Sequence, residues 1–155
     1  MAVCFLLGHR YVPGELWPRL AEAVERHILE FGVRDFVVGH YGEFDAMAAG
    51  AVREAKKRHP EVTLTLLLPY YDPRPGAVLE GCDRTFFPPG MEQVPKPFAI
   101  PRANRYMLAH CDYLICYDKG YPGNTRTLAE AARRRARQGR LRLTELETAA
   151  ERDAK

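Results

Sequence analysis

No apolar run in this sequence approaches the roughly eighteen residues that a membrane-spanning helix needs. The apolar beginning, residues 2–7, is too short for the core of a secretory signal peptide, and no basic leader precedes it. We therefore expect a soluble, cytoplasmic protein with no membrane partner.

Cysteine is scarce, with 4 residues among 155. No Cys-x-x-Cys pair occurs, and the spacing of Cys111 and Cys116 is not that of a zinc finger. Cys4 and Cys116 stand in apolar runs, which is typical of buried free thiols. Free thiols persist in a reducing compartment, so the cysteines also favour the cytoplasm. We expect no metal site and no cofactor.

Neither sign of charge dominates. The chain has 23 Lys and Arg against 20 Asp and Glu, and the net charge of +3 is too small to indicate nucleic-acid binding by itself. The sequence also lacks a Gly-x-x-x-x-Gly-Lys-Ser/Thr loop and a Gly-x-Gly-x-x-Gly fingerprint. These absences argue against phosphate binding of the P-loop kind.

What the chain does contain is an alternation of two patterns. Four apolar runs have the length of strands buried between helices, and they cover residues 3–7, 35–38, 64–68 and 113–117. Between the runs, apolar residues recur at helical spacing, as Leu20, Val24 and Ile28 do. Leu141 and Leu143 indicate a short fifth strand.

This alternation predicts an α/β fold: a Rossmann-like three-layer domain with a mainly parallel sheet of about five strands and helices on both faces. We expect one such domain over residues 1–143. Residues 144–155 are predicted to form a C-terminal helix or tail.

The middle of the chain departs from the alternation. Residues 69–101 contain eight prolines, and a connection of this length is usually functional or mobile. Phe86 and Phe87 indicate a short extra strand within it. A short helix is predicted over residues 102–110, just before the last of the four apolar runs.

Candidate binding residues follow the first predicted strand. In a parallel sheet the loops after the strands open on one edge, where ligands bind at the point of reversed strand order. The first of these loops begins with Gly8, His9 and Arg10. Glycine permits a close approach, histidine titrates near neutral pH, and the arginine fork suits phosphate or carboxylate. The alternative is a polar loop with an incidental arginine.

The second predicted strand is followed by Gly39, Gly42 and Asp45. The two glycines straddle a turn that opens a helix, and the free N–H groups at a helix start attract anions. Asp45 is a candidate either to cap this helix or to hold a ribose hydroxyl. The sequence leaves both roles open.

A third glycine-bearing turn follows the run at residues 113–117 and contains Gly123, Asn124 and Thr125. Asn124 or Thr125 is expected to cap the next helix, whose N–H groups form a second anion site. Glu130 is expected either to face the same cleft or to lie in solvent. Three such turns at three strand ends predict one shared ligand site.

The sequence resembles the SLOG superfamily, which groups Lonely Guy phosphoribohydrolases, the DNA-processing protein A family and small bacterial Rossmann-like proteins. The likeness is strongest to the last group. Its pattern is a strand ending in Gly-His-Arg, a Gly turn with a downstream Asp, a strand ending in Pro, an Asn-x-x-Met element before an Asp-led strand, and a Gly-Gly-Thr-like turn. The matching residues are Gly8-His9-Arg10, Gly39 to Asp45, Pro69, Asn104, Met107, Asp112 and Gly123-Asn124-Thr125.

The resemblance implies a nucleotide or nucleotide-derived ligand held by these residues. Lonely Guy enzymes cleave the N-glycosidic bond of a nucleoside monophosphate with a Pro-Gly-Gly-x-Gly-Thr-x-x-Glu motif. Here Asn124 and Arg126 replace two of its glycines, and Ala103 and Asn104 stand where the enzymes carry Arg-Lys. These departures favour binding over cleavage. The matching stretch is Pro122-Gly123-Asn124-Thr125-Arg126-Thr127-Leu128-Ala129-Glu130.

A binding or sensing domain for a small nucleotide-like molecule is therefore the favoured function. Arg10 and the two helix starts would take phosphate. Asp45 and Asn104 would take ribose or base, and Tyr70 or Tyr71 would stack on a base. A homodimer is compatible with the resemblance.

Two alternatives stay open. An N-glycosidase needs a carboxylate and a positioned acid. Its carboxylate would be Glu130 or Asp45, with Glu130 the tentative catalytic residue, and its acid would be His9 or His40. A nucleic-acid-binding accessory protein is supported by the arginine-rich residues 133–142. A solvated helix face explains the same arginines and is favoured, with balancing carboxylates at Glu145, Glu147 and Glu151.

Overall fold

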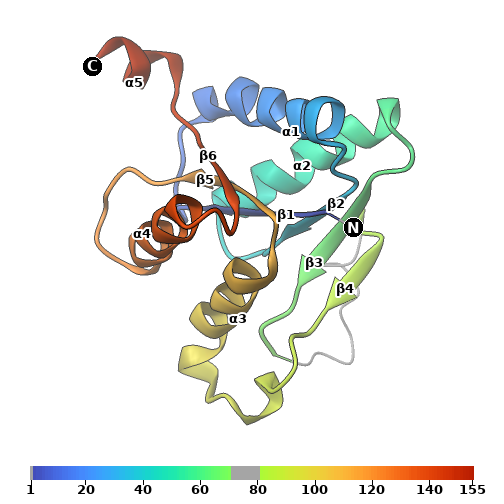
Figure 1. Ribbon diagram of the computed structural model, residues 1–155, viewed down its shortest axis with the longest axis vertical. Coiled ribbons are helices and arrows are strands. Elements are labelled where there is room, and N and C mark those ends of the chain that lie inside the picture. The colour runs from blue at the N-terminus through green and yellow to red at the C-terminus, as the bar shows by residue number, and fades with distance from the viewer. Residues whose placement is uncertain (1, 71–80) are drawn as a thin grey trace.

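The computed structural model describes residues 2–70 and 81–155 and has a parallel β-sheet at its centre (Figure 1). The sheet has six strands in the order β4-β3-β2-β1-β5-β6, and every neighbouring pair is parallel. The predicted α/β fold is confirmed, with six strands rather than about five. The strands are β1 (Val3–Gly8), β2 (Asp35–Val38), β3 (Thr63–Leu67), β4 (Arg84–Phe86), β5 (Tyr113–Tyr117) and β6 (Arg142–Glu145).

The two outer strands are the ones that the sequence indicated most weakly: β6 is the expected fifth strand, and β4 is the sixth. Phe86 ends β4, which pairs with β3 at one edge, and Leu143 lies in β6, which pairs with β5 at the other. A backbone hydrogen bond from the Leu68 N–H to the Phe86 carbonyl extends the pairing of β4 with β3. Phe87, which we expected to share this strand, lies just beyond it.

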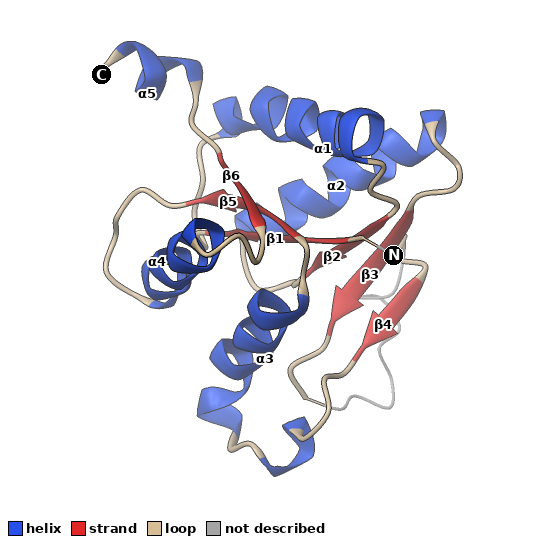
Figure 2. Ribbon diagram, viewed as in Figure 1, coloured by secondary structure: helices blue, strands red, loops and turns tan. Residues whose placement is uncertain are grey.

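Helices cover both faces of the sheet, as Figure 2 shows. Helices α1 (Trp17–Phe31) and α2 (Glu43–Arg58) pack on one face, and α3 (Lys96–His110) and α4 (Asn124–Arg137) pack on the other. A short helix, α5 (Ala149–Asp153), ends the chain. Among the described helices, none is both long and apolar enough to cross a membrane.

The apolar runs are continuous because both faces of each central strand are buried. Successive strand residues point to opposite faces. In β1, Cys4 and Leu6 join the core beneath α1 and α2, whereas Phe5 and Leu7 join the core beneath α3 and α4. Parallel sheets covered on both faces require this kind of sequence. Three free thiols are buried in these cores, those of Cys4, Cys111 and Cys116.

Helix α3 is longer than predicted. We expected it to begin at residue 102, but it begins at Lys96 and contains Pro101. Pro97 lies in the first turn, where a missing N–H costs nothing, and Pro101 forfeits one bond near the same end. Ala99 and Ala103 are buried against the sheet. Their burial holds the first turns in helical form.

Strand order reverses between β1 and β5. The chain builds β1 to β4 outward in one direction and then crosses back to place β5 beside β1. At such a switch point the loops after the two central strands diverge to opposite faces, which leaves a crevice at the carboxyl edge.

Candidate functional site

A cleft of about 340 Å³ opens at the carboxyl edge of the sheet, over β1, β2 and β3 and between the starts of α2 and α4 and the middle of α3. It contains residues from all three glycine-bearing turns. Ten of the eleven residues that the sequence suggested for ligand binding line it, namely Gly8, His9, Arg10, Gly39, Gly42, Asp45, Pro69, Asn104, Asn124 and Thr125. The eleventh, Gly123, lines a neighbouring hollow.

The apolar lining of the cleft was not predicted. Phe5, Leu7 and Leu67 contribute from the strands, and Ile100 and Ala103 contribute from α3. The strand residues look like ordinary core in the sequence. Ile100 was missed because it lies in the part of α3 that the prolines made look irregular. The signal that could have found it is a proline in the first turn, which favours a helix start.

Gly8 is small for a packing reason. A Cβ at this position would lie only 2.2 Å from Cγ of Phe44 in α2. The end of β1 and the first turn of α2 therefore touch directly. The Gly8 carbonyl also accepts a hydrogen bond from the Thr125 hydroxyl of α4, at 3.2 Å. Gly8 thus connects both helix starts that border the cleft.

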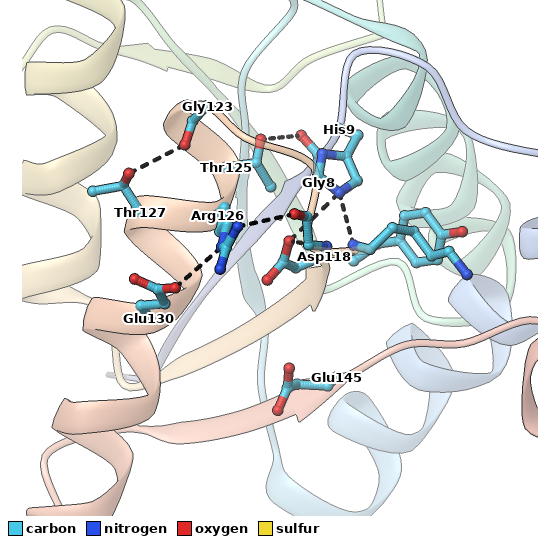
Figure 3. A network of polar contacts seen from close by, with 12 residues as sticks. Gly8, His9, Asp118, Gly123, Thr125, Arg126, Thr127, Glu130 and Glu145 are labelled. Atoms are coloured by element: carbon cyan, nitrogen blue, oxygen red, sulfur yellow. Dashed lines mark hydrogen bonds and ion pairs between the residues drawn. The ribbon is translucent and has the colours of Figure 1, made fainter. Parts of the chain in front are cut away.

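His9 bridges the loops that follow β1 and β5 (Figure 3). Its Nε2 accepts the Lys119 backbone N–H at 2.8 Å, so the ring proton is on Nδ1 when the ring is neutral. Burial lowers the pKa of His9, although nearby Asp118 opposes this. The ring also contacts Tyr117 and Tyr121. His9 therefore links the two loops through Nε2, and the lowered pKa favours its neutral form.

Arg10 supplies an uncompensated positive charge to the cleft. Its side chain is exposed, and within residues 2–70 and 81–155 its guanidinium makes no ion pair. Its carbonyl accepts the Glu43 N–H at 2.7 Å, and the Glu43 carboxylate accepts the Val12 N–H at 3.0 Å. These two bonds fix the backbone around Arg10 on the start of α2. The guanidinium remains available for an anion.

Asp45 places a half-buried carboxyl group in the same cleft. It does not cap α2, because Gly42 is the N-cap and no side chain caps this helix. Instead Asp45 lies in the first turn and accepts the N–H of Tyr41 at 3.0 Å. Burial raises the pKa of Asp45 to about 6, although the bond from Tyr41 acts in the opposite direction. The carboxylate is crowded against Gly39, where a Cβ would lie 2.8 Å from its oxygen.

The start of α4 is also without a side-chain cap. We expected Asn124 or Thr125 in this role, but the N-cap is Gly123, at φ 139°, a backbone conformation that glycine adopts readily. Thr125 instead bonds to Gly8, as described above. Asn124 lines the cleft beside it. The side-chain cap is absent because the residue at the N-cap position, Gly123, has no side chain.

Glu130 lies outside the cleft, so the structure does not group it with the other candidates. Its carboxylate accepts a bond from Arg126 at 3.2 Å, and its side chain is 49% exposed. A residue five positions after Thr125 is about 140° around the helix, which turns Glu130 away from the side that meets Gly8. Figure 3 shows Arg126 directed toward Glu130 and Thr125 directed toward Gly8.

A buried ion-pair network supports the β5 side of the cleft, and sequence reasoning missed it. The Asp118 side chain is 3% exposed and pairs with Arg133 at 3.0 Å. Arg133 also pairs with Glu145, and this pair together with Asp118 raises the pKa of Arg133. A charged side chain at a buried position needs an oppositely charged partner. The aspartate was missed because nothing in the sequence places Arg133 next to it.

The remaining arginines of residues 133–142 are not balanced as we expected. Glu145 does pair with Arg133, but Glu147 pairs with Arg152 and Lys155, and Glu151 pairs with Lys119. The balancing carboxylates are mostly engaged with other elements, because the chain turns away after β6. The Glu151 bond attaches α5 to the loop beside the cleft.

Two other aromatic and histidine candidates lie apart from the cleft lining. Tyr70 packs under Lys96, whose ammonium is 5.3 Å from the ring centroid. Tyr71 lies outside the described residues. The His40 ring contacts Tyr41, with planes inclined at 37°, and borders another hollow, which adjoins the cleft at Gly39, Gly42 and Asp45.

No known family model matches the chain, and no curated protein matches it either.

Proposed function

We propose that this protein is a binding or sensing domain for a nucleotide or a nucleotide-derived ligand, which it holds in the cleft at the carboxyl edge of the sheet. One observation carries the proposal. The cleft at the strand-order switch joins the unpaired guanidinium of Arg10 to the half-buried carboxyl group of Asp45, above an apolar floor. A phosphorylated sugar with an attached base has complementary parts. The resemblance to the SLOG superfamily supports the same class of ligand.

Each cleft residue has a role in this proposal. Arg10 and the uncapped start of α4 take phosphate, because guanidinium and free N–H groups both favour anions. Asp45 accepts hydrogen bonds from ribose hydroxyls, and the Asn104 amide bonds to the base or sugar. The apolar floor, which includes Leu67 and Ile100, receives the base.

Thermal denaturation with a ligand panel tests the proposal. The panel contains the four common nucleoside monophosphates, ADP-ribose and cyclic AMP. A ligand that binds only the native state at 100 times its Kd adds about 2.7 kcal/mol of stability and raises Tm by several degrees. We expect at least one such shift, a reduction of about 10-fold or more in affinity for Arg10→Ala, and no change for Arg102→Ala. Arg102 is a matched control because it borders a different hollow.

Chromatography of the same mixtures distinguishes binding from cleavage. We expect the ligand to be recovered intact. An absence of any Tm shift across the panel, or an equal loss of affinity in the Arg102 control, would contradict the proposal.

One observation favours an N-glycosidase as the second candidate. Asp45 provides a carboxyl group inside the cleft, where an oxocarbenium-like sugar would need one. Glu130, the alternative carboxylate, lies outside. Base release that is lost in Asp45→Asn but retained in Glu130→Gln would make this function the correct one.

A further inference from the structure

A second hollow adjoins the cleft on the far side of Arg10. It measures about 320 Å³, close to the cleft itself at about 340 Å³. The two spaces share His9, Arg10, Asn124 and Thr125 in their linings. The remaining wall of the second hollow is formed by Tyr11, Tyr121, Pro122 and Gly123. We refer to these last four residues as the aromatic wall.

The boundary between the two spaces is held in place from both sides. The Thr125 hydroxyl donates to the Gly8 carbonyl, and the Lys119 N–H donates to the His9 ring. The Arg10 carbonyl is fixed separately by Glu43. Three hydrogen bonds from three elements thus position the short segment that carries Arg10. Arg10 lines both spaces, so an anion bound by its guanidinium lies at their boundary.

The aromatic wall carries two unusually exposed rings. Tyr11 is 72% exposed and Tyr121 is 57% exposed. The Tyr121 ring contacts His9, with ring centroids 4.9 Å apart and planes inclined at 41°. Large rings left open to water at the entrance of a charged cleft form a stacking platform for a planar group, and such stacking tolerates any base.

We propose that the ligand extends past Arg10 onto the aromatic wall, and that it is therefore a dinucleotide in which phosphate joins two nucleoside units. One unit occupies the cleft, the phosphate bridge lies at Arg10, and the second base stacks on Tyr11 or Tyr121. This inference rests on the proposed nucleotide function. The cleft alone is at the lower end of the size range for ligand sites, and the second hollow adds a space of similar volume.

Titration calorimetry on the full chain tests this inference. For each of the four common bases, a nucleoside 5′-monophosphate is compared with the symmetrical dinucleotide that joins two copies through a 5′,5′-pyrophosphate. The base is thereby constant within each pair. We expect at least one dinucleotide to bind about 10-fold or more tightly than its monophosphate. Tyr11→Ala or Tyr121→Ala should remove this advantage while monophosphate affinity stays within about 2-fold.

Two control variants separate stacking from general damage. Phe98→Ala removes a ring that is 64% exposed but lines neither space, so it should leave the advantage intact. Tyr121→Phe keeps the ring and should preserve it. A monophosphate that binds as tightly as its dinucleotide, or an advantage that persists in both alanine variants, would overturn the inference and leave the proposed function standing. Failure of all eight ligands to bind would overturn the inference, and the proposed function would fall with it if ADP-ribose and cyclic AMP also gave no Tm shift.

Discussion

At the scale of single residues, the cleft is defined by two groups whose environments differ. Arg10 is exposed, and its backbone is fixed while its charge has no ion-pair partner in residues 2–70 and 81–155. Asp45 is half-buried, and its carboxylate receives the N–H of Tyr41 but no cation among the described residues. The fold therefore carries a carboxyl group that it partly desolvates. A ligand that donates hydrogen bonds to Asp45 would relieve this unfavourable burial.

Asp45→Asn is expected to stabilise the protein at neutral pH. Burial raises the pKa of Asp45 from its ordinary 3.8 to about 6, so the folded state binds the proton more tightly than the unfolded state does. The favourable contribution of Asp45 is complete below pH 4 and is lost as pH rises through 6. Asparagine keeps an acceptor for the Tyr41 N–H without a charge, which should raise stability by about 1–2 kcal/mol at pH 7.

Urea denaturation at pH 4, 5, 6 and 7 measures this difference. The gain from Asp45→Asn should grow with pH between 4 and 6 and then level off. A variant that is less stable than the wild type at pH 7, or a difference independent of pH, would contradict the assignment.

At the scale of elements, the site depends on how closely α2 and α4 approach the end of β1. The first turn of α2 places Phe44 against Gly8, and the first turn of α4 places Thr125 on the Gly8 carbonyl. The apolar pattern predicted both helices, and the glycines predicted turns before them. The pattern did not predict the caps, because the N-cap positions of α2 and α4 are occupied by glycines, Gly42 and Gly123, and not by the polar residues that follow them.

Gly8→Ala is expected to separate β1 from α2. The new Cβ would lie 2.2 Å from the Phe44 ring, which neither element can accommodate without moving. Overpacking of this kind typically costs about 1–3 kcal/mol, which corresponds to a fall of several degrees in Tm. Thermal denaturation checks this loss. Gly14→Ala is the matched control, since a Cβ there meets nothing within 4 Å.

The double variant Gly8→Ala with Phe44→Leu tests the cause. A smaller side chain at position 44 should recover part of the loss if the clash is responsible. Equal losses for Gly8→Ala and the Gly14 control would show that the contact does not constrain this glycine.

At the scale of the whole molecule, the C-terminal segment contacts the carboxyl end of β5. Glu151 of α5 accepts a bond from the Tyr117 hydroxyl at the end of β5 and pairs with Lys119 in the next loop. Burial alone would raise the pKa of Glu151, but bonds from Lys119, Thr148 and Tyr117 lower it to about 2. The last residues thereby position the loop in which the Lys119 N–H donates a hydrogen bond to His9.

Glu151→Gln is expected to destabilise the protein by about 1 kcal/mol at neutral pH, because charge-assisted bonds to a partly exposed group are of this size. The lowered pKa means that the contribution of Glu151 is complete above pH 4.5 and is lost as pH falls toward 2. Chemical denaturation at pH 7 and pH 3 should therefore show a smaller difference from the wild type at pH 3.

Glu147→Gln provides the comparison for this variant. Among the described residues, Glu147 forms ion pairs only within the C-terminal segment, with Arg152 and Lys155, so its loss should have a smaller effect at both pH values. A larger effect for Glu147 than for Glu151 would mean that the attachment to β5 is not the stabilising contact.

The sequence by itself determined the class of fold and most of the cleft lining. Apolar runs at strand length, separated by helical spacing, admit few arrangements other than a covered parallel sheet, and a parallel sheet gathers its strand ends at one edge. That physical constraint is why residues as distant as Gly8, Asp45 and Asn124 could be grouped before their positions were known. Asn104 was grouped with them only through the resemblance to the SLOG superfamily.

Only the tertiary structure decided which candidates face the cleft and what partners they have. The helical phase after Thr125 turns Glu130 into solvent, and the pairing of Asp118 with Arg133 joins residues from different elements. Neither is encoded in a local pattern, because both depend on how far a helix rotates when it packs. The sequence contains many charged groups, and the packing brings Arg10 to the cleft without an ion pair among the described residues.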